Sequence, residues 1–322
     1  MIELKTYFSK ELPGINRFLE SETAKLDGLV QQVAAHVLLG GGKRIRPILT
    51  MATARALGCA ETNLLPMACA LEMLHTATLL HDDVLDGAEL RRGTRAAHLK
   101  FGVNETILSG DVLLALANQL GASYGKARIS WLLAEGIMAT ATGEVMEIAT
   151  LGTPEVDRQT YLDIIIGKTA KLIETACCCG AVLATDDPAA EDAAGAFGLN
   201  LGIAFQLVDD ALDYVSRTEN TGKAVGGDLR EGKVTLPLIL LLEQMDGSEA
   251  ASLLAKLRES TLTDQEINSI LATVDEKGYA AATRQEAADY ILKAKTALAF
   301  FPDGLEKNVL EQAADFVLAR EK

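Results

Sequence analysis

The feature that most constrains the fold is a pair of acidic clusters, each embedded in an apolar stretch. Asp82, Asp83 and Asp86 lie in HDDVLD, and a second cluster has the same D-D-x-x-D spacing in QLVDDALDY. Both stretches are predicted to be helical, and residues four apart lie on one face of a helix. Asp82 is therefore expected to lie beside Asp86, so that at least two carboxylates of the cluster point the same way.

The second cluster consists of Asp209, Asp210 and Asp213, and by the same argument Asp209 lies beside Asp213. Burying so many like charges together is costly unless cations neutralise them. Hard divalent ions with oxygen ligands, Mg²⁺ above all, satisfy carboxylates of this kind. The two clusters therefore predict a helical protein that binds Mg²⁺.

Length and composition favour a large helical domain. The 322 residues include 49% hydrophobic residues, which is ample for a core, but only 5% aromatic residues. Ala and Leu abound, which favours helix over strand. We expect an all-α fold that forms a single domain over residues 1–322, with long helices bundled around a deep central cavity.

Charge and hydropathy exclude several classes of protein. The formal net charge of −15 argues against nucleic-acid binding and against docking on anionic lipid. No uninterrupted apolar run reaches the length of a membrane span, so no stable membrane anchor is expected. The N-terminal stretch lacks the apolar core of a signal peptide. Five cysteines, three of them consecutive at 177–179, do not form a disulfide framework, and a reduced, cytoplasmic protein is the simplest interpretation.

Helical periodicity recurs along nearly the whole chain. Four glycines and mixed charge predict a loop over 217–234, helices resume from about 235, and strand-like alternation is absent. The expected helices cover about 4–36, a stretch after Gly40–Gly42, 63–87, 104–122, 128–149, 155–183 and 189–216.

Basic residues accompany both acidic clusters. Lys43, Arg44 and Arg46 follow a triple glycine, and Arg91-Arg92-Gly93 follows the first cluster. Arginine forks and lysine ammonium groups are phosphate ligands. Carboxylate-bound Mg²⁺ together with several such groups indicates one or two doubly phosphorylated substrates, whose diphosphate could be stabilised as it leaves. Further basic residues in this context are Lys168, Lys223 and Lys233.

Between about residues 40 and 240 the chain carries, in order, GGKRIRP, LEMLHTATLLHDDVLD, RRG, GE at 143–144, YLDIIIGKTAKL, FQLVDDALDY and GKAVGGDLREGKVTLP. This succession resembles the trans-type isoprenyl diphosphate synthases, and most of all their long-chain, octaprenyl-forming members. Two D-D-x-x-D motifs at this separation, with RRG after the first, are highly specific. The resemblance implies the isoprenoid synthase fold, a homodimer, and two motifs that face each other across the cavity.

The resemblance also implies a role for individual residues. Mg²⁺, with three ions per active site, would be bound by Asp82, Asp86 and Asp209, and supported by Asp83, Asp210 and Asp213. An allylic diphosphate would be held by Arg91, Lys168, Lys223 and Lys233. Isopentenyl diphosphate would be held by Lys43, Arg46, His75 and Arg92. The developing allylic cation would be bordered by Thr169 and Gln206.

The implied reaction is prenyl transfer. The diphosphate of the allylic substrate leaves, the isopentenyl double bond attacks C1 of the resulting cation, and a proton passes to the departed diphosphate. No protein nucleophile is required. Because water would quench the cation, the site must exclude it, and catalysis is electrostatic and positional.

Product length follows from helix geometry if the nascent chain grows beside the helix that carries Asp82. At a rise of roughly 1.5 Å per residue, the positions four and five residues before Asp82 lie about 6–7.5 Å deeper. They hold Thr78 and Ala77, and Leu74 and Ala70 follow without an aromatic side chain. In the family that the chain resembles, bulky residues at the first two positions mark short products. We therefore expect a long-chain, octaprenyl-like product for quinone side chains.

Some positions have two interpretations. His75 on an apolar helix could be a core histidine, but its basic context favours a diphosphate contact. His81 is interpreted as structural, whereas Thr169 and Gln206 could be ordinary polar residues of a helix. The resembled family often has Gln three residues after the Glu of its GE motif, whereas this chain has Glu147 three residues after Glu144. Glu147 could be a harmless exposed difference, or it could alter a metal-linked network.

Three other functions compete with prenyl transfer. The His81-Asp82 doublet occurs in metal-dependent phosphohydrolases, but that function leaves the second acidic cluster without a role. A class I terpene cyclase usually needs aromatic walls, and the chain is poor in aromatic residues. A non-catalytic subunit of a two-component synthase would be expected to lack some of the aspartates or basic residues, which are all present here.

Overall fold

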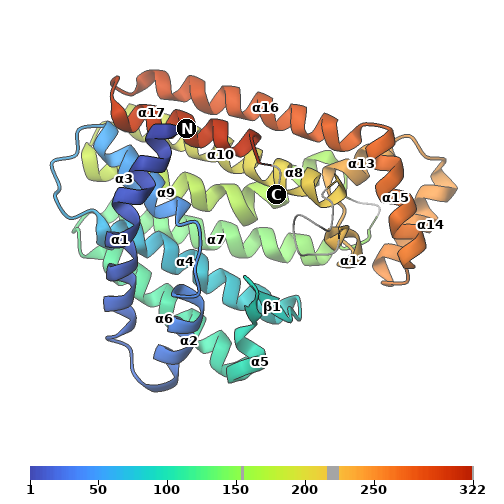
Figure 1. The fold of residues 1–322 in the computed structure, drawn as a ribbon, viewed down its shortest axis with the longest axis horizontal. Helices are drawn as coiled ribbons and strands as arrows, with labels where there is room; N and C mark the ends of the chain where they lie inside the picture. Colours follow the sequence, from blue (N-terminus) through green and yellow to red (C-terminus); the bar gives the residue numbers. More distant parts are fainter. Residues whose placement is uncertain (154–155, 216–224, 321–322) are drawn as a thin grey trace. The chain divides into compact units, whose positions relative to one another are not determined.

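The computed structural model describes residues 1–153, 156–215 and 225–320. Apart from one short hairpin, all regular elements within these ranges are helices (Figure 1), which confirms the all-α prediction. The first half contains α1 (Ile2–Thr23), α2 (Gly28–Leu38), α3 (Ile45–Ala56), α4 (Leu65–Leu85), β1 (Leu90–Arg91), β2 (Thr94–Arg95), α5 (Ala97–Phe101), α6 (Val103–Ala122) and α7 (Ala127–Thr150). The second half contains α8 (Arg158–Ile165), the π-helical η1 (Ile166–Ala170), α9 (Lys171–Ala184), α10 (Pro188–Val215), α12 (Gly227–Arg230), α13 (Leu236–Leu242), α14 (Gly247–Arg258), α15 (Asp264–Glu276), α16 (Tyr279–Ala297), η2 (Leu298–Phe300) and α17 (Leu305–Leu318).

The chain forms two compact units. Unit 1 comprises Met1–Ile137, Leu172–Gly195 and Leu298–Gln312. Unit 2 comprises Met138–Lys171, Ala196–Ala297 and Ala313–Lys322. The helices α7, α10 and α17 contribute residues to both units. The expectation that residues 1–322 form a single functional domain stays a prediction.

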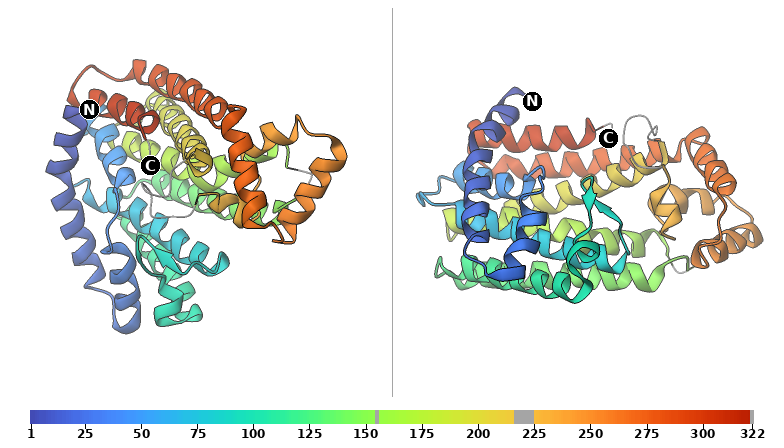
Figure 2. Two further views of the ribbon diagram at one scale, coloured as in Figure 1. Left: turned by 45° about the vertical axis from the view of Figure 1, so that its right-hand side comes forward. Right: turned by 60° about the horizontal axis from the view of Figure 1, so that its bottom comes forward.

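In unit 1, α4 is the central helix. It packs against α6, α3 and α1, and Figures 1 and 2 both show α4 running beside α6. Met67, Leu71 and Leu74 on α4 are completely buried. Each such side chain stabilises the fold by roughly 1.5–3 kcal/mol relative to an exposed one. This apolar packing holds the C-terminal end of α4, and with it the first aspartate motif.

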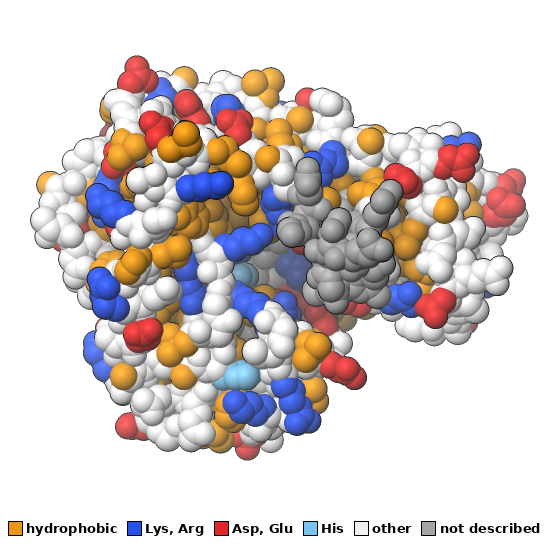
Figure 3. Space-filling view, in the orientation of Figure 1, with side chains coloured by type: hydrophobic (Ala, Val, Ile, Leu, Met, Phe, Trp, Pro, Cys, Tyr) orange, Lys and Arg blue, Asp and Glu red, His pale blue; other side chains and the backbone are white. Residues whose placement is uncertain are grey.

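In unit 2, α13 packs against α16, α8 and α15. The α13 sequence LPLILLL is apolar. Its buried leucine and isoleucine residues are Leu236, Leu238, Ile239 and Leu241. The helix α15 begins with a capping box, in which Thr263 and Glu266 satisfy each other's backbone N–H groups. At the α14–α15 end, Figure 3 shows scattered acidic side chains among other polar and some hydrophobic groups, as expected for an exposed helical face.

The predicted single helix over 4–36 is wrong, because the structure has two helices there. The helix α1 ends at Thr23, and turn hydrogen bonds from Lys25 and Leu26 follow it. Gly28 then adopts a φ of +57°, which residues other than glycine rarely adopt. The Asp27-Gly28 pair was therefore a turn signal within an otherwise helical pattern.

Two further expectations need correction. The chain does contain strands, because β1 and β2 form a two-stranded antiparallel hairpin. Within the predicted loop over 217–234, the described residues include the short helix α12. The helix expected over 155–183 is divided into α8, η1 and α9, and the π-helical turn η1 contains Lys168 and Thr169.

The other predicted helices agree closely with the structure. Those expected over 63–87, 104–122, 128–149 and 189–216 correspond to α4, α6, α7 and α10. Among the described residues, no helix is both long enough and apolar enough to cross a membrane.

Candidate active site

The first aspartate motif lies at the end of α4. Asp82 and Asp83 belong to the last turn of α4, and Asp86 is its C-cap residue, whose N–H donates to the Asp82 carbonyl at 2.8 Å. Asp83 is buried, Asp82 is half-buried and Asp86 is exposed. The motif therefore offers two solvent-accessible carboxylates and one that is enclosed by protein.

The RRG segment forms a tight turn that brings Arg91 onto Asp83. The turn residues Arg92 and Gly93 have φ values of +52° and +77°. Two consecutive residues with positive φ are typical of a type I′ hairpin turn, which strongly favours glycine. Arg91 Nε donates to Asp83 Oδ1 at 2.7 Å, and its Nη2 donates to the same oxygen. The enclosed aspartate thus positions the first arginine of the motif.

Cationic side chains surround His75 in unit 1. Burial, followed by the positive charges of Arg46, Arg92 and Arg91, holds the pKa of His75 well below its usual value. The imidazole is therefore neutral at pH 7. Burial also lowers the pKa of Arg46 to about 10, and the buried Nε of Arg46 has no hydrogen-bond partner among the described residues. Positive charge that the protein only partly neutralises is suited to binding a diphosphate.

Arg44 has a structural role in the same basic segment. It adopts a φ of +51°, and its buried guanidinium pairs with Glu72 of α4 at 2.8 Å and donates to the Leu38 carbonyl. This buried ion pair ties the glycine-rich turn to α4. The neighbouring Lys43 is exposed, and Arg46 lies in the first turn of α3.

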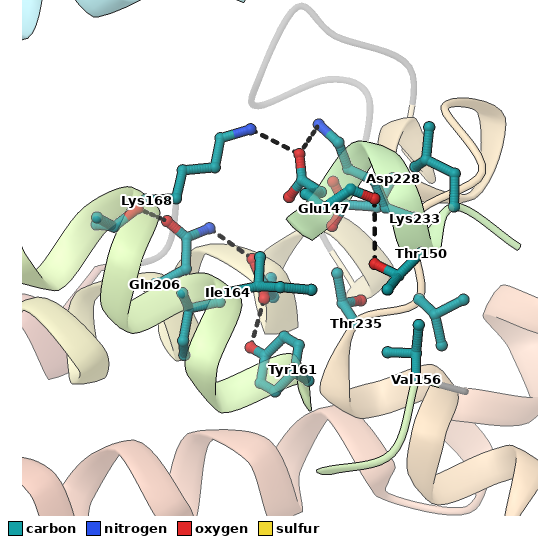
Figure 4. A pocket seen from close by; sticks show the side chains of 15 residues that line it. Glu147, Thr150, Val156, Tyr161, Ile164, Lys168, Gln206, Asp228, Lys233 and Thr235 are labelled. Atoms are coloured by element: carbon teal, nitrogen blue, oxygen red, sulfur yellow. Dashed lines mark hydrogen bonds and ion pairs between the residues drawn. The ribbon is translucent and has the colours of Figure 1, made fainter. Parts of the chain in front are cut away.

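Asp210 is the buried member of the second motif on α10. It accepts hydrogen bonds from the Tyr161 hydroxyl at 2.5 Å and from Gln206 Nε2 at 2.7 Å. Gln206 Oε1 accepts in turn from Thr169 Oγ1 at 2.9 Å, and Figure 4 shows this chain of side chains. Burial outweighs these hydrogen bonds and raises the pKa of Asp210 to about 7. A nearby cation would lower this pKa again and stabilise the carboxylate.

The two other aspartates of the second motif differ in their surroundings. Asp213 accepts hydrogen bonds from the backbone N–H groups of Gly227 and Asp228 at 3.2 and 3.0 Å, which joins α10 to α12. Burial raises the pKa of both Asp213 and Asp228. Asp209 is exposed and forms an ion pair with Arg320 at 2.7 Å. Asp209 is therefore the accessible carboxylate of this motif.

A pocket in unit 2 joins this hydrogen-bonded chain to two lysines (Figure 4). Lys168 comes from η1, and Lys233 follows α12. Both approach Glu147 of α7, whose Oε2 lies 2.6 Å from Lys168 Nζ and 3.7 Å from Lys233 Nζ. Thr169 and Gln206 also line the pocket. The pocket thus combines amines that suit phosphate with polar groups that suit a developing positive charge.

The position of Lys168 depends on a close approach between α7 and η1. A Cβ atom at Gly143 would lie 2.5 Å from the backbone nitrogen of Lys168, so only glycine fits there. Glu144, the next residue, forms an ion pair with Lys168 Nζ at 2.7 Å. The π-helical turn provides the extra backbone residue that often marks a functional position. Gly143-Glu144 on α7 and Gly167-Lys168-Thr169 on η1 therefore pack directly against each other.

The predicted site residues belong to two groups. Unit 1 holds Asp82, Asp83, Asp86, Lys43, Arg46, His75, Arg91 and Arg92, and unit 2 holds Lys168, Thr169, Gln206, Asp209, Asp210, Asp213 and Lys233. Lys223 lies outside the described residues. That both groups act on one pair of substrates stays a prediction.

The predicted chain-length positions lie on α4 in unit 1. Ala70, Leu74 and Ala77 are completely buried. Thr78 is half-buried, and its hydroxyl donates to the His75 carbonyl at 2.8 Å. Their assignment as lining of a product channel stays a prediction.

Sequence reasoning missed three residues that contact the second motif. Tyr161 resembled an ordinary core aromatic residue, whereas Asp228 could have been noticed as an acidic residue in the glycine-rich stretch after the motif. Arg320 gave no signal, because it lies 111 residues from its partner Asp209. Only the folded chain brings these groups together.

The carboxylates fit Mg²⁺ by their chemistry. Within residues 1–153, 156–215 and 225–320, no three His, Cys, Asp or Glu side chains already form a metal site. Mg²⁺ commonly keeps several water ligands and is bound through one or two carboxylates plus phosphate oxygens of the substrate. Accessible oxygen donors and a buried aspartate with a raised pKa suit an ion that arrives with a diphosphate.

Comparison with known proteins gives consistent matches. The family described as polyprenyl synthetase matches residues 27–274. The octaprenyl diphosphate synthase of Escherichia coli is 33% identical over 98% of this chain and 97% of its own length. The all-trans-nonaprenyl-diphosphate synthase (geranyl-diphosphate specific) of Rhodobacter capsulatus is also 33% identical, over 97% and 95% of the two chains. A crystal structure of a Caulobacter crescentus polyprenyl synthase, complexed with calcium and isoprenyl diphosphate, has a TM-score of 0.92 and 39% identity, covering 99% of this chain and 98% of that chain.

Proposed function

Since the chain belongs to the polyprenyl synthetase family, and is thus a trans-polyprenyl diphosphate synthase, we propose that it adds successive isopentenyl diphosphate units to an allylic diphosphate until a long, octaprenyl-like all-trans chain is made. The observation that carries this proposal is that Asp210 of the second aspartate motif lines the unit 2 pocket together with Lys168 and Lys233. We further propose that the product supplies quinone side chains.

Three aspartates are proposed to hold Mg²⁺, with three ions per active site. Asp82 and Asp209 are the accessible carboxylates of α4 and α10, and Asp86 is exposed beside Asp82. When bound, Mg²⁺ supplies positive charge that stabilises the diphosphate as it leaves. Asp83 is assigned a supporting role because it positions Arg91, and Asp210 because it orients Gln206.

Two sets of basic groups are proposed to divide the substrates between them. Amines and guanidinium groups bind diphosphate oxygens directly. Isopentenyl diphosphate would be bound by Lys43, Arg46, Arg92 and the neutral imidazole of His75, and the allylic diphosphate by Arg91, Lys168, Lys233 and Lys223.

The reaction then needs no nucleophile from the protein. The C1–O bond of the allylic diphosphate breaks, and the electron pair leaves with the diphosphate. The isopentenyl double bond forms the new bond to C1, and the departed diphosphate accepts the proton that is lost. Thr169 and Gln206 are proposed to border the cation, because both line the pocket and the Thr169 hydroxyl donates a hydrogen bond to the Gln206 carbonyl oxygen there. Their oxygen atoms favour positive charge without attacking it.

Product length is proposed to be set on α4. Ala77 and Thr78 are small, and neither Leu74 nor Ala70 introduces an aromatic ring. A growing chain beside this face of α4 would meet no bulky floor in the first turns. The relatives range from short-chain and geranylfarnesyl to octaprenyl and nonaprenyl synthases, so the proposal of a long product rests on these side chains and does not fix the last unit.

The purified enzyme is expected to convert farnesyl diphosphate and labelled isopentenyl diphosphate into products that carry several added units. Chromatography of the dephosphorylated products measures this, and chelation of Mg²⁺ with EDTA should abolish chain growth until Mg²⁺ is restored. Arrest after one or two additions would contradict the long-chain assignment.

The same assay distinguishes the competing functions. Phosphate released from one substrate alone would indicate a phosphohydrolase, and a cyclic hydrocarbon would indicate a terpene cyclase. His81 does not support the phosphohydrolase alternative, because its Nε2 contacts the Ile107 carbonyl of α6 at 3.0 Å. Activity of the isolated chain would exclude a non-catalytic subunit.

A homodimer is proposed from exposed apolar side chains on the long helices. On α6, Val103, Ile107 and Leu108 are exposed, and on α7 the side chain of Trp131 is 60% exposed. Large apolar side chains exposed on helices indicate an interaction surface where they lie together, as Val103 and Ile107 do four residues apart on α6. Light scattering of the purified protein should give twice the chain mass of 34.3 kDa, whereas a mass of one chain at micromolar concentration would contradict the proposal.

A cytoplasmic location is proposed from the cysteine chemistry. All five cysteines are free thiols, and burial raises the pKa of Cys69, Cys177, Cys178 and Cys179. Buried thiols with raised pKa values are unreactive packing residues. Unpaired cysteines are typical of proteins from a reducing compartment.

A further inference from the structure

Glu147 lies between the two described lysines of the unit 2 pocket. Its Oε2 is 2.6 Å from Lys168 Nζ and 3.7 Å from Lys233 Nζ (Figure 4). The side chains of Glu147 and Lys233 are each 18% exposed, and that of Lys168 is 22% exposed. One partly enclosed carboxylate therefore bridges the amines that are proposed to hold the allylic diphosphate.

Neither lysine depends on Glu147 for its position. Lys168 Nζ also pairs with Glu144 at 2.7 Å, and Lys233 Nζ also pairs with Glu231 at 2.6 Å. Each amine would keep a carboxylate partner if Glu147 lost its charge. The bridge is therefore additional to the contacts that anchor the lysines.

The pocket already contains an excess of acidic groups. Asp210 and Asp228 line it together with Glu147, and Lys168 and Lys233 are the only basic residues among its described lining residues. A diphosphate that enters must share these two amines with Glu147 and also tolerate its negative charge. At partly buried positions, such like-charge repulsion is screened only weakly.

We propose that Glu147 is an internal competitor for the diphosphate group, which lowers the affinity of the site for diphosphates by occupying Lys168 and Lys233. Glu147 is thus a positioning residue that acts through the lysines. The proposal rests on the proposed assignment of these lysines to the allylic diphosphate. It also gives a role to Glu147 at a position where the family that the sequence resembles often has Gln.

The test is calorimetric binding of inorganic pyrophosphate at a fixed Mg²⁺ concentration. Glu147→Gln removes the charge but keeps the size and polarity of the side chain, so it should bind pyrophosphate about tenfold more tightly than the unchanged protein. Glu231→Gln is the control, because among the described residues the Glu231 carboxylate pairs with Lys233 and not with Lys168, and its side chain is 53% exposed to screening by water. The control should change the dissociation constant by less than twofold.

Kinetics provide a second measurement, because a residue with a merely structural role would not alter the KM of one substrate alone. In Glu147→Gln, the KM for the allylic diphosphate should fall while the KM for isopentenyl diphosphate stays constant. Glu147→Asp keeps the charge in the pocket but shortens the side chain, so its KM for the allylic diphosphate should stay above that of Glu147→Gln. Thermal unfolding of each variant establishes that the fold is retained.

Three outcomes separate this inference from the proposed function. If Glu147→Gln binds pyrophosphate no more tightly, the competitor role is overturned. If that variant binds more weakly and needs more Mg²⁺, Glu147 supports metal binding instead, and the inference is also overturned. If a folded Lys168→Ala/Lys233→Ala protein keeps full pyrophosphate affinity, the assignment of the lysines fails, and the proposed function of this pocket fails with it.

Discussion

Replacing Asp209 with Asn is expected to lower kcat/KM for chain elongation about a thousandfold. The carboxylate is exposed on α10, so the change removes charge without disturbing the core. A lost carboxylate at a metal site removes several kcal/mol of charge stabilisation, and each factor of ten in rate corresponds to about 1.4 kcal/mol. Initial rates with farnesyl and isopentenyl diphosphates at saturating Mg²⁺ measure the effect.

The control for this change lies on the same helix. Asp192 is an exposed aspartate of α10 outside the motif, and Asp192→Asn should leave kcat/KM unchanged within twofold. Asp82→Asn should resemble Asp209→Asn, because both carboxylates are assigned to metal. If either motif variant kept activity within tenfold of the unchanged enzyme, that aspartate could not hold an essential ion.

Ala77→Tyr is expected to shorten the product to a few isoprene units. The ring would stand on the face of α4 about one and a half turns before Asp82, where the growing chain is proposed to pass. Chromatography of the products should show farnesyl or geranylgeranyl lengths accumulating, with the rate of the first addition largely retained.

The experiment must distinguish a blocked product channel from a fold that is destabilised by overpacking. Ala77 is completely buried, so a larger side chain costs roughly 1–3 kcal/mol of stability through overpacking. Thr78→Phe, at a half-buried position, should shorten the product with less loss of thermal stability. Unchanged product length in a folded Ala77→Tyr protein would reject α4 as the floor of the channel.

The helices were largely predictable from the sequence, because their apolar periodicity is strong and long. The predicted 104–122 differs from α6 by one residue at its start, and the predicted 189–216 begins one residue after α10 begins. The break between α1 and α2 was missed because a single turn with Gly28 interrupts a periodicity that resumes at once. The RRG hairpin was missed because two-residue strands are too short to give alternation.

The chemistry of the site was predictable in kind but not in its contacts. The aspartate motifs and basic residues stand out as types at fixed spacings. Their actual partners, such as Arg91 on Asp83 and Arg320 on Asp209, depend on where the chain returns in space. Arg44 illustrates the difference, because it lies in a basic motif and yet forms a buried ion pair with Glu72.

The central claim is that both aspartate motifs act on one metal-bound diphosphate. A crystal structure of the enzyme with Mg²⁺ and a non-reactive thio analogue of an allylic diphosphate tests it most directly. We predict Mg²⁺ ions about 2.0–2.1 Å from carboxylate oxygens of both Asp82 and Asp209, with the same diphosphate bridging them. Ions and diphosphate bound to only one motif, with the other open to separate solvent, would contradict the claim.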